Sequence, residues 1–281
     1  MGRVKVSRSA PRLQVGVTLT DSSTRDKLVD FCRALGDASG FDVTPVGVWY
    51  YQRLLDALNV GDIDVVWLPP ILAAQATRDC RAIPIALPVR GGVSAYSTAL
   101  FAREGSKVRR LEDLQGARAA WVDRQSASGY LLIRAHLRAQ GIDPDRTLGE
   151  GLFLGSHEEV ARAVLEGAAD VGATFVYLDA ERDVPLRAGW GHGKVQLIAS
   201  AGPIPADVLA VSAHLDPKRA RVVQRLLIHQ GYPKLRMTSA ALLGTDVFTR
   251  PNPTYIEALV ALLPRLDAHA QPHRSHWPRG I

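Results

Sequence analysis

The chain of 281 residues has only two cysteines and no apolar run that approaches the ~18 residues a membrane-spanning helix needs. Cys32 and Cys80 lack metal-ligand spacing, and two cysteines do not by themselves imply a disulfide. Aromatic residues make up 6% of the chain, and the basic residues behind its net charge of +6 are scattered. These features disfavour a membrane-spanning or a nucleic-acid-binding protein, and they favour a mild attraction for small anions.

The start of the sequence also lacks the apolar core of a secretory leader. Residues 1–12 are basic and run directly into a strand-like segment, so the sequence as written predicts cytoplasmic residence. A leader trimmed before this numbering begins would instead place the protein in the periplasm or envelope. Residues 1–12 and 269–281 show no periodicity and are predicted to be disordered tails.

Hydrophobic residues, by contrast, are abundant at 47%, which is enough for two modest domains. Short apolar segments alternate with helical patterns over residues 13–89, and this order predicts a parallel α/β sheet. Further strands are predicted at 119–122 and 171–176, each followed or preceded by a helix. Two unusually long extended stretches, 94–103 and 195–211, interrupt the alternation.

An internal repeat links the two halves of the chain. Residues 57–65, ALNVGDIDV, match residues 163–171, AVLEGAADV, and both copies place a glycine before an aspartate that leads a buried strand. The offset of 163 − 57 = 106 residues carries Tyr51 onto His157, so each half offers a hydrogen-bonding side chain where an equivalent helix begins. Two such halves predict a ligand held between them.

The segment 119–137 predicts an anion site. A buried strand, AAWV, turns through residues 126–129, SASG, into a helix that begins at Tyr130. The first N–H groups of a helix have no internal partner and carry partial positive charge, so two hydroxyls and a glycine without a Cβ let an anion come close. The alternative is an ordinary serine N-cap.

Ordered motifs over about residues 13–250 carry a family resemblance. The motifs are YQRLLDALNVGDIDVVWLPP, AYSTALFAREGS, LEDLQGARAAWVDRQSASGYLLIRAHLRAQGIDP, GSHEEVARAVLEGAADVGAT and PIPADVLAVS. Together they resemble the phosphate/phosphite/phosphonate substrate-binding proteins of ABC importers. The resemblance implies the two-lobed α/β fold of type II periplasmic binding proteins, with two parallel-rich sheets flanked by helices and a two-stranded hinge. Lobe 1 would comprise residues 13–97 and 204–266, and lobe 2 residues 98–203.

The resemblance also implies which residues contact the ligand. The middle position of the family's Ser-Thr-Ser anion loop falls on an alanine here, which keeps an N–H group but has no hydroxyl. A polar position expected after Val171 stays open between Thr174, Tyr177 and Asp179, and recognition of an aminoalkyl tail depends on it. The implied ligand contacts are Tyr51, Tyr96, Ser126, Ala127, Ser128, Gly129, His157 and Asp207.

Several of these residues have a plainer interpretation. Tyr51 and Tyr96 are also consistent with ordinary amphipathic aromatics, and Asp207 with a turn cap. His157 is also consistent with a helix start that contacts no ligand. Cys32 lies on an apolar helix face and is predicted to be core.

Three functions remain open from the sequence. We expect a monomeric solute-binding protein that captures a phosphonate, phosphate or phosphite for ABC-type uptake, with no cofactor and an ABC permease as its partner. A cytosolic sensor that docks a partner protein is the first alternative. An enzyme on the same fold is the second, although His157 with Asp207 is a thin case for catalysis and no nucleophile–base pair or metal cluster is evident.

Overall fold

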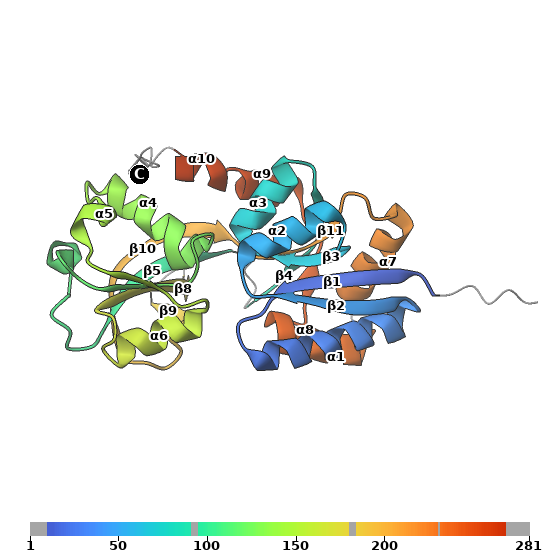
Figure 1. Ribbon diagram of the computed structural model, residues 1–281, viewed down its shortest axis with the longest axis horizontal. Helices are drawn as coiled ribbons and strands as arrows, with labels where there is room; N and C mark the ends of the chain where they lie inside the picture. Colours follow the sequence, from blue (N-terminus) through green and yellow to red (C-terminus); the bar gives the residue numbers. More distant parts are fainter. Residues whose placement is uncertain (1–9, 91–94, 180–183, 230, 268–281) are drawn as a thin grey trace, which may run out of the picture.

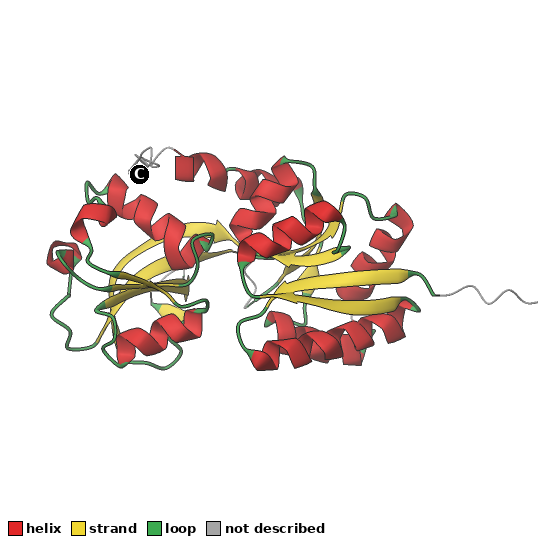
Figure 2. Ribbon diagram, in the orientation of Figure 1, coloured by secondary structure: helices red, strands yellow, loops and turns green. Residues whose placement is uncertain are grey.

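The chain folds into two α/β lobes that lie side by side, and the computed structural model describes residues 10–90, 95–179, 184–229 and 231–267 (Figure 1). Each lobe is built on its own sheet, with helices on the faces (Figure 2). The first sheet and its helices comprise β1 (Arg12–Thr18), α1 (Ser22–Ser39), β2 (Asp42–Val48), α2 (Tyr51–Val60), β3 (Val65–Leu68), α3 (Pro70–Arg78), β4 (Ala82–Pro88), β11 (Val208–Ser212), α7 (Pro217–Ile228), α8 (Pro233–Leu243), β12 (Phe248–Thr249), α9 (Pro253–Val260) and α10 (Leu262–Asp267). The second sheet and its helices comprise β5 (Ala95–Arg103), the 3-10 turn η1 (Leu111–Leu114), β6 (Ala119–Trp121), the π-helical turn η2 (Ala127–Leu131), α4 (Leu132–Ala139), α5 (Pro144–Thr147), β7 (Gly151–Phe153), α6 (His157–Leu165), β8 (Val171–Leu178), β9 (Pro185–Ala188) and β10 (Val195–Pro205).

Both sheets are mixed. In the first, β1 pairs in parallel with β2 and β3, whereas β11 lies antiparallel between β3 and β4. In the second, β6 pairs in parallel with β7 and β8, whereas β5 is antiparallel to β8 and β10. The parallel order predicted for residues 13–89 holds, since β1, β2, β3 and β4 all run in the same direction. The first sheet is mixed because the chain leaves it after β4 and returns to it as β11 in the opposite direction.

The two long extended stretches are strands that pair with each other. β5 and β10 run antiparallel, with Val195 opposite Arg103 at one end and Pro205 opposite Ala95 at the other. They carry the chain from the first lobe to the second and back again (Figure 1). The predicted lobe boundaries, between residues 97 and 98 and between 203 and 204, fall inside these two strands. The assignment of residues to lobes at these boundaries stays a prediction.

The internal repeat corresponds to repeated structure. In both copies the glycine has a positive φ, 83° in one and 82° in the other, where a side chain would be strained. Asp64 accepts the backbone N–H of Gln14 at 2.8 Å, and Asp170 accepts that of Arg118 at 2.9 Å. Each aspartate thus ties the start of its own strand to a neighbouring strand, which explains why the same pattern precedes β3 and β8.

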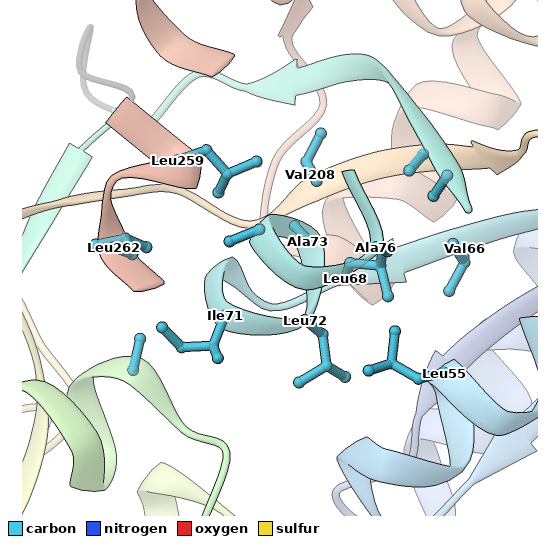
Figure 3. Close-up of a cluster of buried hydrophobic side chains, with 14 of the residues drawn as sticks. Leu55, Val66, Leu68, Ile71, Leu72, Ala73, Ala76, Val208, Leu259 and Leu262 are labelled. Carbon is cyan, nitrogen blue, oxygen red and sulfur yellow. The ribbon is translucent and has the colours of Figure 1, made fainter. Parts of the chain in front are cut away.

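The apolar core of the first lobe continues into the second. Figure 3 shows its central part, where α3 packs against β3, β11 and the C-terminal helices through side chains such as Leu72, Val208 and Leu259. Ala127 and Leu132 of the second lobe belong to the same buried cluster. The lobes therefore touch through apolar side chains on this side of the molecule.

Among the elements that the structure describes, four were not predicted from the sequence: α5, β9, α8 and β12. The predicted tails fall mostly outside the described residues, although β1 already begins at Arg12. No helix in the described ranges combines the length and apolar character needed to pass through a bilayer.

Candidate functional site

A cavity of about 300 Å³ lies between the lobes and takes its walls from both. It is lined by side chains at the ends of strands and the starts of helices, which is where α/β sheets commonly bind ligands. Five of the eight predicted contacts line it, namely Tyr51, Tyr96, Ser128, His157 and Asp207.

The repeat places Tyr51 and His157 at equivalent positions, as the first residues of α2 and α6. His157 Nδ1 lies 2.8 Å from Thr174 Oγ1 on β8, and burial lowers the pKa of the imidazole to about 4. The ring is therefore neutral at pH 7. A Cβ on Gly189 would lie 1.9 Å from Thr174 Oγ1, so the glycine makes room for the threonine that supports His157.

The two tyrosines present protonated hydroxyls to the cavity. Burial raises the pKa of both Tyr51 and Tyr96, and the nearby charge of Asp207 raises each further. The Tyr96 ring packs against Tyr177 and Phe175, with ring centroids 5.8 and 6.5 Å away. This packing holds the Tyr96 ring in place at the cavity wall.

The predicted anion loop divides into two parts. Ser128 lines the cavity, and its carbonyl accepts a hydrogen bond of 2.6 Å from the Thr98 hydroxyl. Ser126 is instead the N-cap, because its buried hydroxyl accepts the Gly129 N–H at 3.0 Å. The cap interpretation therefore describes Ser126, while Ser128 has the position expected of a ligand contact.

Ala127 and Gly129 serve the packing of the same loop and do not line the cavity. Ala127 is 2% exposed within the apolar cluster between the lobes, where a hydroxyl would be buried among hydrocarbon. A Cβ on Gly129 would lie 2.4 Å from Cγ2 of Val122, the residue that follows β6, so only glycine lets the loop approach Val122 this closely. The helix after the loop begins with a π-helical turn and becomes α-helical at Leu132, slightly later than predicted.

Asp207 faces a cation that sequence reasoning missed. Arg90 Nη1 lies 3.9 Å from Asp207 Oδ2 and donates to the Tyr177 hydroxyl at 3.4 Å, while Nη2 donates to the Leu243 carbonyl at 2.6 Å. Burial raises the pKa of the Asp207 carboxyl, and Arg90 offsets part of that rise. Burial disfavours the charged form of the carboxyl, and Arg90 places a positive charge beside it. Both effects reduce the repulsion between Asp207 and an anion bound nearby.

Arg90, Trp67, Phe175 and Arg187 also line the cavity and were not predicted to do so. Nothing in the local sequence singles out Arg90 among 34 lysines and arginines. Of the three candidates after Val171, the cavity is lined by Tyr177, while Thr174 supports His157 from behind and Asp179 does not line it.

The two cysteines lie apart from this cavity. Cys32 is buried in the core as predicted, and desolvation raises the pKa of its thiol to about 12. Cys80 is free and exposed. Within the described ranges, no three His, Cys, Asp or Glu side chains gather as metal ligands.

Solved structures of other proteins have a similar two-lobed fold. A protein from Xanthomonas citri, solved bound to ATP, is 24% identical and superposes with a TM-score of 0.73 over 93% of this chain and 100% of that one. The binding protein component of an ABC phosphonate transporter from Pseudomonas aeruginosa is 19% identical and gives a TM-score of 0.72 over 92% of this chain and 95% of that one. These likenesses show the two-lobed fold of type II periplasmic binding proteins.

Sequence comparison identifies the family. The phosphate-import protein PhnD of Mycolicibacterium smegmatis is 21% identical over 178 residues, which are 60% of this chain and 55% of that protein, so this chain spans about half the length of the curated relative it matches. Residues 15–254 match the family described as "ABC transporter, phosphonate, periplasmic substrate-binding protein". The chain therefore belongs to the family of periplasmic substrate-binding proteins of phosphonate ABC transporters.

Proposed function

We propose that this protein captures a small phosphorus oxyanion, a phosphonate, phosphate or phosphite, in the interlobe cavity for ABC-type uptake. The observation that carries the proposal is the convergence of Tyr51, Tyr96, Ser128, His157 and Asp207 on one cavity. These residues come from five separate segments of both lobes, and the family resemblance implies a ligand contact for each of them.

The donors suit an anion that has tetrahedral oxygens. The hydroxyls of Tyr51, Tyr96 and Ser128 are neutral donors in a partly buried site, where hydrogen bonds to a charged oxygen are strong. When the Thr174 hydroxyl donates to His157 Nδ1, the imidazole proton lies on Nε2 and is available to the ligand.

A thermal-shift screen tests the proposal. At a concentration of about 100 times its dissociation constant, a ligand stabilises its protein by roughly 2.7 kcal/mol, which is about 5–10 °C for a chain of this size. We expect such a shift with at least one of phosphate, phosphite and methylphosphonate, and a smaller one with sulfate or acetate. If no phosphorus oxyanion raises the melting temperature above the sulfate control, the proposed ligand class is wrong.

We also propose that the protein works in the periplasm or envelope, in contrast to the cytoplasmic residence expected from the sequence as written. The family description, which is periplasmic, supports this location. Fractionation of the native host with antibody detection would decide the question. Recovery in the cytoplasm would favour the alternative, a ligand sensor with a partner protein, and would contradict the uptake role.

A further inference from the structure

The cavity is lined by two chemically different sets of polar groups. The hydroxyls of Tyr51 and Ser128 and the imidazole of His157 supply neutral donors. Elsewhere on the wall, Arg90 and Arg187 supply guanidinium groups. Since the neutral donors suit the phosphorus oxyanion on the proposed function, the guanidinium groups are left to meet the rest of the ligand.

The two guanidinium groups approach each other from opposite lobes. Arg90 follows β4 of the first lobe, and Arg187 lies on β9 of the second. The position of a Cβ on Gly244 would be 3.7 Å from Arg187 Nη2 and 3.8 Å from Arg90 Nε, so both side chains converge at the end of α8. Two cations held this close favour an anion between or beside them.

The charges of the described lining residues do not balance. Lys27, Arg90 and Arg187 are cationic, and Asp207 is the acidic residue among them. Asp21 interacts with Lys27 from outside the lining, which leaves the two arginines against Asp207. Asp207 already faces Arg90 at 3.9 Å, so an incoming ammonium group would meet a carboxyl that has a cation beside it. An anionic group would be attracted by the excess positive charge.

The Arg90 guanidinium is held in position and has N–H donors left for an anionic group. Its Nη2 donates to the carbonyl of Leu243 in the last turn of α8, where the helix dipole favours a cation, and its side chain is 14% exposed. The bonds to Leu243 and to the Tyr177 hydroxyl use two of the five guanidinium N–H donors. A carboxylate accepts paired guanidinium donors in a planar, bidentate arrangement that an amine cannot reproduce.

We propose that Arg90 determines specificity at this site by selecting phosphonates whose short tail ends in a second anionic group, such as a carboxylate, over aminoalkyl phosphonates. The inference rests on the proposed function and names the class of ligand within it. Arg187, from the opposite lobe, adds to the same positive field. A cavity of about 300 Å³ has room for a phosphonate with such a tail.

Isothermal titration calorimetry with three probes tests the proposal: phosphonoacetate, 2-aminoethylphosphonate and methylphosphonate. The wild type should bind phosphonoacetate at least about 10-fold more tightly than 2-aminoethylphosphonate, the effect of one charge-assisted contact. Arg90→Gln should lower that ratio at least about 10-fold. Arg53→Gln removes the same charge from α2 but at a side chain that is 72% exposed and outside the lining, so this control should keep the wild-type ratio.

The possible results distinguish failure of the proposed role of Arg90 from failure of the proposed function. A wild type that binds methylphosphonate but prefers 2-aminoethylphosphonate, or an unchanged ratio in Arg90→Gln, overturns the role of Arg90 and leaves the proposed function standing. Failure of all three probes to bind overturns the role of Arg90, and it overturns the proposed function as well if phosphate and phosphite also give no thermal shift. Should Arg90→Gln fail to fold, Arg90→Lys keeps the charge without the planar fork, and its affinity for phosphonoacetate should fall at least about 3-fold; an unchanged affinity would contradict the proposal.

Discussion

Two serines of one loop, Ser126 and Ser128, should respond differently to the same substitution. The Ser126 hydroxyl accepts the Gly129 N–H at 3.0 Å, as the side chain of a helix N-cap does. Loss of such a cap costs about 1 kcal/mol, which lowers the melting temperature of a chain of this size by about 2–4 °C. Ser126→Ala should therefore destabilise the free protein and leave most of the ligand affinity in place.

Ser128→Ala should show the reverse pattern. Its hydroxyl is placed to donate to the bound oxyanion, and a bond to a charged group contributes about 1.5–3 kcal/mol, so the dissociation constant should rise roughly 10- to 150-fold. The free protein should melt near the wild type. Melting curves with and without methylphosphonate measure both effects in each variant. If Ser128→Ala lowers the melting temperature and leaves the affinity unchanged, the serine is structural and the assignment is refuted.

Other predictions follow from the cavity and the lobes. Thr174→Val removes the partner of His157 Nδ1 and should weaken oxyanion binding in calorimetry about 3- to 10-fold, whereas unchanged affinity would show that Thr174 does not orient the ring. Because the folded pKa of His157 is about 4 and its ordinary value is 6.5, the unfolded chain binds more protons between these values, so stability should fall as pH drops from 6.5 to 4. Chemical denaturation should show a flatter dependence over that window in His157→Gln, and equal slopes would contradict the burial of a neutral ring. Small-angle scattering should show a smaller radius of gyration when a phosphorus oxyanion is added, and an unchanged value would argue against lobe closure.

Helices and strands could be predicted from the sequence where their buried residues match a local pattern of apolar residues. β3, with its buried run of valines and leucine, and α2, with Leu54, Leu55 and Leu58 inward, are of this kind. β9 is largely exposed, so it carries no apolar alternation. α8 buries only Leu235, Ser239 and Leu243, and a stripe this narrow gives little signal. Such elements are fixed by tertiary contacts, which a local pattern does not contain.

The same distinction applies to the site. Tyr51 and His157 were predictable because the repeat gives them equivalent places in the two halves. Arg90 was not, since its position depends on the carbonyl of Leu243, 153 residues away in the sequence, and on Asp207. Nor does a pattern with two serines reveal which hydroxyl faces the cavity and which one caps the helix.

Calorimetric titration with methylphosphonate of the wild type and of a Tyr51→Phe, Ser128→Ala double variant tests whether the interlobe cavity holds the oxyanion. The two substitutions remove one hydroxyl from each lobe without adding bulk. We expect one bound ligand per chain in the wild type and a loss of affinity of at least about 100-fold in the double variant, which still folds. Equal affinity in the two proteins would show that the ligand binds elsewhere and would contradict the assignment of the interlobe cavity.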